Sequence, residues 1–355
     1  MPEDAVLDPS NFHLRNDIAA KRRRVAALYS GDEVLLSPMA GVTDMVFRAV
    51  CREHGADVTF CEFASAEGVV HGNESTRQLI ELAEDEHPVG IQLFGSDPAA
   101  MARAAVEAEK LGPDVIDLNF GCPVKKVVKR NGGSALLCNV PLMEEIVRAV
   151  VEATSLPVTA KTRLGWSTKS LNYLETTQML EEAGACAITM HGRTRDQKFT
   201  GIADWRPIAE MKEVAEVPII GNGDIWNAED YLRIKAETNC DAVMIARAAI
   251  GNPFVFEEIR AAKRGEDHEP PSVERVVEVL LDHIDRELAL KGPRTGMHRM
   301  KRHFTTYLKG CPGVADLRKQ VFATNDRDVI EAAFRRYRDE HAGFRPEPAR
   351  RPQVA

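Results

Sequence analysis

Near its middle the chain reads Asp117-Leu118-Asn119-Phe120-Gly121-Cys122-Pro123-Val124-Lys125-Lys126 and continues to Gly132-Gly133-Ser134. The apolar residues at 115, 116 and 118 predict a short buried strand. The strand gives way to a loop at Asn119 and Cys122, and three lysines follow at 125, 126 and 129. A thiol beside positive charge has the setting of a reactive cysteine. A buried structural cysteine next to a turn fits this loop equally well.

The alternation of short apolar runs with longer helical stretches repeats along the chain, which is typical of βα units and a parallel sheet. The predicted strands are Val34–Met39, Val58–Phe63, Val89–Phe94, Val115–Asn119, Pro157–Arg163, Ala187–His191, Val217–Asn222 and Ala242–Arg247. Eight such units over about 230 residues predict a (β/α)8 TIM barrel. The alternative is a doubly wound open sheet. That fold expects a G-x-G-x-x-G turn after the first strand, where this chain has Met39-Ala40-Gly41-Val42-Thr43-Asp44.

The active site of a barrel enzyme lies at the carboxyl ends of its strands. Each predicted strand ends in polar or unusual residues, namely Pro38-Met39, Glu62, Gln92, Asn119, Lys161 with Arg163, His191 with Arg193, Asn222-Gly223-Asp224 and Arg247. Any one of them could be a capping or loop residue. Their occurrence at every strand end predicts a single shared site.

The chemistry of these strand ends suits a flavin mononucleotide. Phosphate sites of barrels commonly follow strands seven and eight, where Gly223 allows close backbone approach and Arg247 adds a planar charged donor. Gln92 can donate to and accept from the edge of a heteroaromatic ring. Lys161 supplies positive charge for a ring that becomes anionic on reduction. We therefore expect FMN as the cofactor.

Several motifs resemble those of the tRNA-dihydrouridine synthase family. They are Ser37-Pro38-Met39-Ala40-Gly41-Val42-Thr43-Asp44, Gln92-Leu93-Phe94-Gly95, Asn119-Phe120-Gly121-Cys122-Pro123, Lys161-Thr162-Arg163, His191-Gly192-Arg193-Thr194 and Gly221-Asn222-Gly223-Asp224-Ile225. The motifs run in family order from about residue 34 to 256, and Lys125-Lys126-Val127 is most similar to the bacterial B-type branch.

The resemblance implies roles for individual residues. The FMN contacts would be Pro38, Met39, Ala40, Gln92, Lys161, His191, Asn222, Gly223, Asp224, Ala246 and Arg247. Cys122 would be the catalytic proton donor, and Asn119, Arg163 and Arg193 would contact the substrate uracil. The family usually has Gly-Arg where this chain has Ala246-Arg247. The added methyl group is tolerated only if φ is negative there, so we expect a slightly altered phosphate turn.

The electronics of uracil define the expected reaction. The C5=C6 bond is conjugated to the C4 carbonyl, so hydride enters at C6 and C5 then needs a proton. Cys122 can deliver that proton only while it remains a thiol. Nearby lysines would lower its pKa, so we expect Lys125 and Lys126 to face tRNA phosphate instead of the sulfur. NADPH is the expected reductant of FMN, using the same open site.

The composition describes a globular protein of 355 residues with 44% hydrophobic residues and a net charge of −8. No apolar run approaches the roughly 20 residues of a membrane span, and the acidic N-terminus lacks a signal-peptide core. The seven cysteines show no zinc-binding spacing. We expect a cytoplasmic protein with reduced thiols, without membrane or metal, and monomeric.

The predicted organisation has four parts: an N-terminal lead-in at 1–33 with a basic run at 21–24, the FMN-binding barrel at 34–262, a helical tRNA-binding domain at 272–342 and a disordered tail at 343–355. Helices in the second domain are expected at about 295–308, 314–322 and 327–341, after one that begins at Ser272. The segment from Lys291 to Lys319 contains eight lysines and arginines and one aspartate, which gives it a local charge of +7. We expect Arg299, Lys301 and Arg302 to bind RNA there, with Phe304 and Tyr307 in the core.

Two alternatives remain open. An FMN barrel reductase of a free pyrimidine or small enone would share the barrel chemistry but would need no basic helical domain. A catalytically silent RNA-binding barrel would bind no flavin and would purify as a colourless protein.

Overall fold

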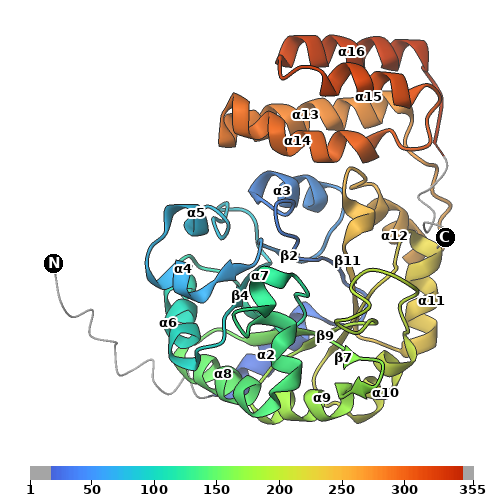
Figure 1. Ribbon diagram of the computed structural model, residues 1–355. Helices are drawn as coiled ribbons and strands as arrows, with labels where there is room; N and C mark the ends of the chain where they lie inside the picture. Colours follow the sequence, from blue (N-terminus) through green and yellow to red (C-terminus); the bar gives the residue numbers. More distant parts are fainter. Residues whose placement is uncertain (1–16, 347–355) are drawn as a thin grey trace.

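The computed structural model describes residues 17–346, which form a barrel and a separate layer of helices (Figure 1). The barrel strands are β1 Val34–Leu36, β2 Thr59–Phe60, β4 Val89–Phe94, β5 Val115–Asn119, β6 Val158–Arg163, β9 Ile188–His191, β10 Ile219–Asn222 and β11 Ala242–Ile245. They pair in parallel in the order β1-β11-β10-β9-β6-β5-β4-β2.

A parallel bridge between Leu35 and Val58 joins the first and last strands of this order and closes the ring. The predicted (β/α)8 barrel is therefore confirmed, and the open-sheet alternative is wrong. Three short strands were not predicted: β3 Ala64–Ser65, which pairs with β4, and the hairpin of β7 Gly165–Ser167 with β8 Ser170–Leu171.

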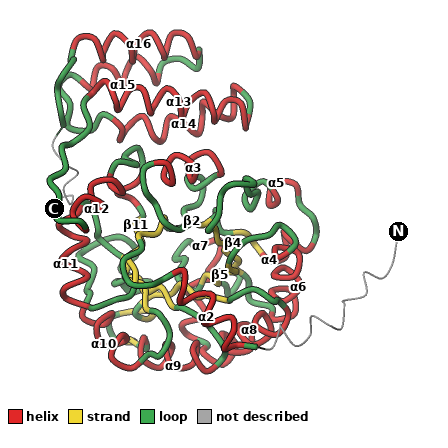
Figure 2. The backbone as a smooth tube through the Cα atoms, turned by 180° about the vertical axis from the view of Figure 1, so that it is seen from behind, coloured by secondary structure: helices red, strands yellow, loops and turns green. Residues whose placement is uncertain are grey.

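Helices surround the ring, as Figure 2 shows from behind. Those of the barrel are α2 Ile18–Leu28, α3 Met45–Glu53, α4 Ala66–Val70, α5 Glu74–Arg77, α6 Pro98–Glu109, α7 Lys125–Val128, α8 Val140–Ala153, α9 Tyr173–Glu182, α10 Arg206–Val214, α11 Ala228–Thr238 and α12 Val255–Lys263, with 3-10 turns at Gly133–Cys138 and Arg247–Ala249. Side-chain caps fix several starts. At α6, for example, Asp97 accepts from the Ala100 amide at 2.8 Å and Pro98 occupies the first turn.

Strand β5 shows how the barrel interior becomes a site. Ile116 and Leu118 point outward and pack with the surrounding helices, whereas Val115 points inward and packs with Leu35 and Ile220. Above Val115 the inward positions of β5 are occupied by Asp117 and Asn119, both buried. The floor of the barrel is therefore apolar and its carboxyl end is polar.

Helix α2 closes the amino end of the barrel. Val25 and Tyr29 pack against the inward-facing residues of the floor. Lys21, which belongs to the basic run of the predicted lead-in, is buried, and its Nζ donates to the carbonyls of Val151 and Thr154 at 2.8 and 2.7 Å. Lys21 therefore does not contribute to a basic surface, although it belongs to the basic run at 21–24. Its charge instead caps the carboxyl end of α8. Residues 1–16 of the lead-in and 347–355 of the predicted tail lie outside the described part of the chain.

The second layer contains α13 Val273–Lys291, α14 Pro293–Tyr307, α15 Val314–Phe322 and α16 Arg327–Glu340. These helices share a hydrophobic core of their own, to which Phe304 and Tyr307 belong, as predicted. Figure 1 shows the layer above α3 and α12. Aromatic contacts join it to the barrel, because the ring of Phe47 lies 5.7 Å from that of His283 and 4.8 Å from that of His303.

An ion cluster also joins the two layers. The guanidinium of Arg299 on α14 lies 3.0 Å from Asp44, 2.5 Å from Glu62 and 3.3 Å from Glu287. Arg299 was predicted to bind RNA, but its side chain is 21% exposed and lies against three acidic side chains. The structure therefore argues against an RNA contact by Arg299. If its side chain turned toward RNA, buried carboxylates would lose their positively charged partner. Arg302, one turn away, donates to the carbonyl of Gly41.

Replacing Glu287 with glutamine tests the charge state of this cluster. Burial, followed by the charge of Asp44, raises the pKa of Glu287 from 4.5 to about 8. Between these values the folded protein holds a proton that the unfolded chain releases, so this contribution to stability is complete below the lower value and is lost as pH rises toward 8. Relative to Glu287→Gln, the wild-type free energy of unfolding should fall with pH by at most about 1.4 kcal/mol per unit, because the other buried groups titrate alike in both proteins.

Urea unfolding at about pH 5.5 and about pH 8.5 measures both proteins. Glu278 is exposed on the same helix, so Glu278→Gln should follow the wild-type profile. Equal destabilisation by Glu287→Gln at both pH values would instead show that Glu287 is ionised and bound to Arg299.

Candidate active site

A cavity of about 380 Å³ opens at the carboxyl ends of the barrel strands. This volume lies in the range of small-molecule and cofactor sites. Its lining includes these residues singled out from the sequence: Pro38, Met39, Ala40, Gln92, Asn119, Cys122, Lys161, Arg163, His191, Asn222, Gly223, Asp224, Ala246 and Arg247. Residues from all parts of the barrel thus line one cavity, as expected for parallel strands that end at the same edge.

One side of the cavity is built around Asn222. Its Oδ1 accepts from Lys161 Nζ at 3.0 Å and from His191 Nδ1 at 2.7 Å, while its Nδ2 donates to the Met244 carbonyl at 2.7 Å. These contacts assign the proton of His191 to Nδ1. Burial, followed by the charges of Arg163 and Lys161, holds the pKa of His191 well below its ordinary value, so the ring is neutral. Its buried Nε2 has no partner within the described chain and can accept from a ligand.

Lys161 carries a charge that the protein alone stabilises poorly. Burial, followed by the charge of Arg163, lowers its pKa to about 7. A ligand atom that accepts a hydrogen bond or carries negative charge would favour the protonated amine. The cavity therefore suits an occupant with electron-rich oxygen or nitrogen atoms against Lys161.

Cys122 sits in a loop that is held from two sides. Asn119 Oδ1 accepts from the Cys122 amide at 2.9 Å, and Ser134 Oγ donates to the Cys122 carbonyl at 2.9 Å. Burial raises the pKa of the thiol, against the smaller lowering effects of the Val124 amide and Arg163. The sulfur is therefore a protonated acid at neutral pH. Lys125 and Lys126 follow on α7, where both are exposed to solvent.

Arg163 and Arg193 were both predicted to contact substrate, and the structure separates them. Arg163 lines the cavity, but its guanidinium also donates to the carbonyls of Gly121, Thr194 and Lys198 at 2.7, 3.1 and 2.9 Å. It thereby ties the Cys122 loop to the loop after β9. Burial lowers its pKa to about 10, which leaves it charged.

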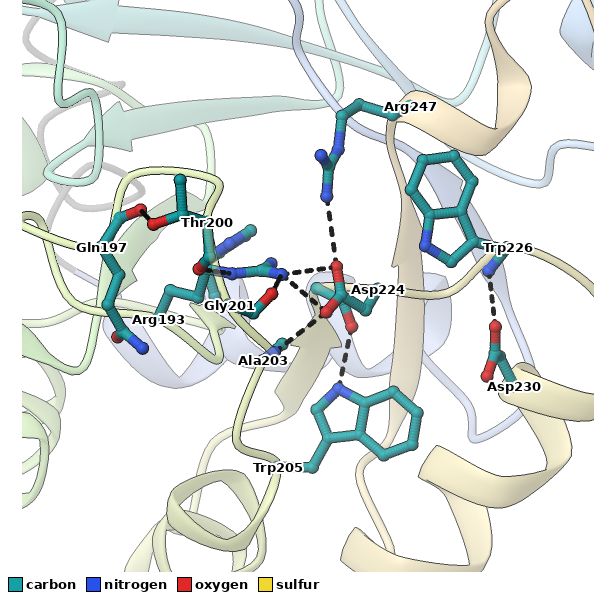
Figure 3. A network of polar contacts seen from close by, with 12 residues as sticks. Arg193, Gln197, Thr200, Gly201, Ala203, Trp205, Asp224, Trp226, Asp230 and Arg247 are labelled. Atoms are coloured by element: carbon teal, nitrogen blue, oxygen red, sulfur yellow. Dashed lines mark hydrogen bonds and ion pairs between the residues drawn. The ribbon is translucent and has the colours of Figure 1, made fainter. Parts of the chain in front are cut away.

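Arg193 does not line the cavity. Its Nη2 lies 2.8 and 2.6 Å from the two oxygens of Asp224, and both side chains are nearly inaccessible, at 2% and 3% exposure (Figure 3). Arg247 approaches the same carboxylate at 3.1 Å from the cavity side. Because Arg193 is buried in this pair and does not line the cavity, the geometry argues against direct substrate contact by Arg193.

The backbone beyond β10 and β11 agrees with the sequence. Ala246 has φ −120°, which meets the condition that the sequence set for a methyl group at this position. Gly223 has φ +120°, and an added Cβ there would lie 3.0 Å from that of Ala203. A glycine is therefore required at this point of the cavity wall.

Sequence reasoning missed several residues of the site, of which three matter most for its chemistry. Phe199 lines the mouth with its side chain 54% exposed, and the guanidinium groups of Arg163 and Arg247 lie 5.5 and 5.6 Å from its ring. Trp226 lines the cavity beside Arg247 (Figure 3). Both lie in loops beyond the strand ends, where no periodicity marks them. Asp117 lies beneath the cavity wall and was read only as part of a buried strand.

Residues 17–346 contain no group of three or more His, Cys, Asp or Glu side chains placed to hold a metal ion. Within the same part of the chain, no helix combines the length and apolarity needed to cross a membrane.

Comparison with known proteins agrees with the motifs. Residues 35–340 match the family model described as dihydrouridine synthase. "Probable tRNA-dihydrouridine synthase 1" of Synechocystis sp. is 38% identical over 89% of this chain and 90% of that protein. "tRNA-dihydrouridine synthase B" of Pseudomonas aeruginosa is 37% identical over 86% and 92%, and a "Probable tRNA-dihydrouridine synthase" of Mycobacterium leprae is 35% identical over 85% and 87%. The resemblance read from the motifs is confirmed, and the chain belongs to the dihydrouridine synthase family.

Proposed function

We propose that this protein reduces the C5=C6 bond of uridines in tRNA, with FMN as its flavin and Cys122 as the proton donor. The observation that carries the proposal is a single cavity in which a protonated thiol shares walls with Gln92, Lys161 and Arg247. Membership of the family supports a flavin-dependent oxidoreductase acting on tRNA.

The cavity residues fit an FMN group. Burial lowers the pKa of Lys161, and Nε2 of His191 has no hydrogen-bond partner within the described chain. The polar edge of the flavin ring would supply a partner for both groups. Arg247 and the backbone of Gly223, which both line the cavity, suit a single phosphate. Pro38, Met39 and Ala40 form an apolar wall at the end of β1. When bound there, FMN supplies the hydride that adds to C6 of uracil.

The remaining cavity residues act on the uracil. Asn119 and Arg163 can orient it through hydrogen bonds that they donate to its carbonyl groups. Cys122 holds its proton because its surroundings raise the thiol pKa, so the proton remains available for C5 as negative charge develops there. We assign Arg193 a supporting role through Asp224 in place of the predicted substrate contact.

The RNA surface that we propose has two parts. Lys125 and Lys126 lie on α7 directly after the Cys122 loop. Lys301 and Arg302 lie on α14 in the helical domain, whose boundary with the barrel we place between 263 and 272. A uridine must leave its stack to reach a barrel cavity, and contacts to the surrounding phosphates can supply the necessary binding energy.

NADPH is the proposed reductant, using the same open cavity in a separate half-reaction. The family's substrate and the sequence features of the chain also lead us to propose a cytoplasmic monomer.

Substitution of Cys122 tests the proposed chemistry. Purified wild-type protein should carry flavin and form dihydrouridine in tRNA with NADPH. Cys122→Ala should retain flavin and its reduction by NADPH, but the rate of dihydrouridine formation should fall by about 10²- to 10⁴-fold, because the general acid is lost. Flavin absorbance and mass spectrometry of tRNA nucleosides measure the two half-reactions separately.

Cys138→Ala is the matched control, since Cys138 is a solvent-exposed thiol, and it should behave as wild type. Full turnover by Cys122→Ala would refute the proton-donor role. Equal reduction of free uridine or a small enone without tRNA would favour the small-molecule reductase instead.

Charge removal on α7 tests the RNA surface. The double substitution Lys125→Ala/Lys126→Ala should raise the KM for tRNA and lower the slope of log affinity against log salt by about 1 to 2, because two phosphate contacts disappear. Flavin reduction by NADPH in the absence of tRNA should keep its wild-type rate.

Arg103→Ala/Lys110→Ala removes the same charge from exposed positions on α6 and just beyond its carboxyl end, which leads into the amino end of β5. This control should leave the salt slope unchanged. An equal loss in both double variants would mean that net charge alone, and no contact at α7, governs tRNA binding.

A further inference from the structure

Asp117 is a buried carboxylate that the reaction outlined above does not use. It lies on β5 with 2% of its surface exposed. It accepts from Gln92 Nε2 at 2.5 Å and from Thr159 Oγ1 at 2.6 Å. Both partners are neutral, and an ionisable group so placed costs free energy unless its hydrogen bonds compensate. The position therefore needs a physical reason.

A chain of hydrogen bonds runs from this carboxylate to the catalytic loop. Gln92 Oε1 accepts from Asn119 Nδ2 at 2.7 Å. Asn119 Oδ1 in turn accepts from the amides of Gly121 at 3.1 Å and Cys122 at 2.9 Å. Three side chains thus connect the interior of β5 to the backbone of the proposed proton donor.

The chain has a fixed direction because an ionised carboxylate only accepts hydrogen bonds. Asp117 forces the NH₂ group of Gln92 toward itself, so the Gln92 oxygen faces Asn119. That oxygen holds the Asn119 NH₂ group, so the Asn119 oxygen faces the Cys122 loop. Each amide nitrogen carries two hydrogens and uses one in the chain. Because both amides line the cavity, one N–H of each is left for an occupant.

The state of Asp117 agrees with this role. Burial raises its pKa to about 6, while Thr159, Gln92 and the charge of Lys161 act in the opposite direction. The carboxylate is therefore predominantly ionised at neutral pH and can orient the amides.

We propose that Asp117 is a positioning residue that sets the direction of the Gln92 and Asn119 amides, so that the cavity offers N–H donors to its occupant and the Cys122 loop stays fixed. The identity of that occupant, a flavin ring with a uracil, rests on the proposed function. The orientation of the amides and of the loop does not.

Asp117→Asn is the primary test, made with Cys138→Ala in every protein so that the exposed thiol does not react. An asparagine at position 117 can donate or accept, so the direction of the chain is lost. The Kd for FMN should rise about fivefold, the effect of one misplaced hydrogen bond. The rate of Cys122 alkylation by iodoacetamide in flavin-free protein should change by a similar factor.

A second variant separates the two consequences. In Asp117→Asn/Gln92→Glu the new carboxylate at position 92 can only accept, so it again holds the Asn119 NH₂ group. The alkylation rate of Cys122 should return to the wild-type value. FMN affinity should stay low, because position 92 no longer offers a donor.

Thr159→Val, measured at about pH 8 so that Asp117 stays ionised although a hydrogen bond that lowers its pKa is lost, is the structural control, since it leaves the amides untouched. It should keep both wild-type values. The proposal fails if Asp117→Asn changes neither readout, if Thr159→Val reproduces its effects, or if neither position-117 variant folds, because Asp117 would then be a structural residue. Alkylation of flavin-free protein requires no catalysis, so its result is independent of whether tRNA is reduced.

Discussion

Closure of the barrel between Leu35 and Val58 is the constraint on which the rest of the structure depends. In an open sheet the ends of β1 and β2 would lie at opposite edges, and the residues that follow them could not share a cavity. Closure brings the loop after β1 beside the loop after β2, and both beside the ends of β4 and β11. The register then decides the rest, because Asn119 pairs with Lys161 and Asn222 with His191 at the same height. A slip of one residue would turn these side chains out of the barrel.

Collecting polar groups inside a barrel has an energetic cost that hydrogen bonds must offset. The protein meets part of this cost by pairing buried charges. Arg193 and Asp224 neutralise one another, and so do Arg48 and Glu86, whose Nη2 and Oε2 atoms lie 2.9 Å apart at almost complete burial. Lys161 and His191 are treated differently, since burial, followed by the charge of Arg163, lowers the pKa of each, and Nε2 of His191 has no partner within the described chain. Buried ion pairs have their charges satisfied by the protein, whereas Lys161 and His191 do not. This contrast marks the part of the interior that can bind a ligand.

The fold and most of the cavity could be predicted from the sequence, because the hydrophobic periodicity of a segment and the end of a strand are local properties. Gln92, Asn119, Lys161 and Asn222 follow from the rule that parallel strands end at one edge. The roles of Arg193 and Arg299 could not be predicted, because their partners come from elsewhere in the chain. Asp224 is 31 residues from Arg193, and Glu62 is 237 residues from Arg299. A count of charges along the sequence indicates only a basic helix, whereas the fold places Arg299 against three acidic side chains.

The same ion cluster connects the helical domain to the wall of the cavity. Gly41 follows Met39 and Ala40 directly, and its φ of +69° places its amide and carbonyl where two other segments can reach them. Glu62 accepts from the amide, while Arg302 on α14 donates to the carbonyl. Glu62 is also bound by Arg299 on α14. A side chain at position 41 would collide with the Arg302 guanidinium, so glycine is what permits this contact. The same residues therefore fix both the placement of the helical domain and the shape of one cavity wall. As long as these bonds remain, a movement of the helical domain also moves the wall.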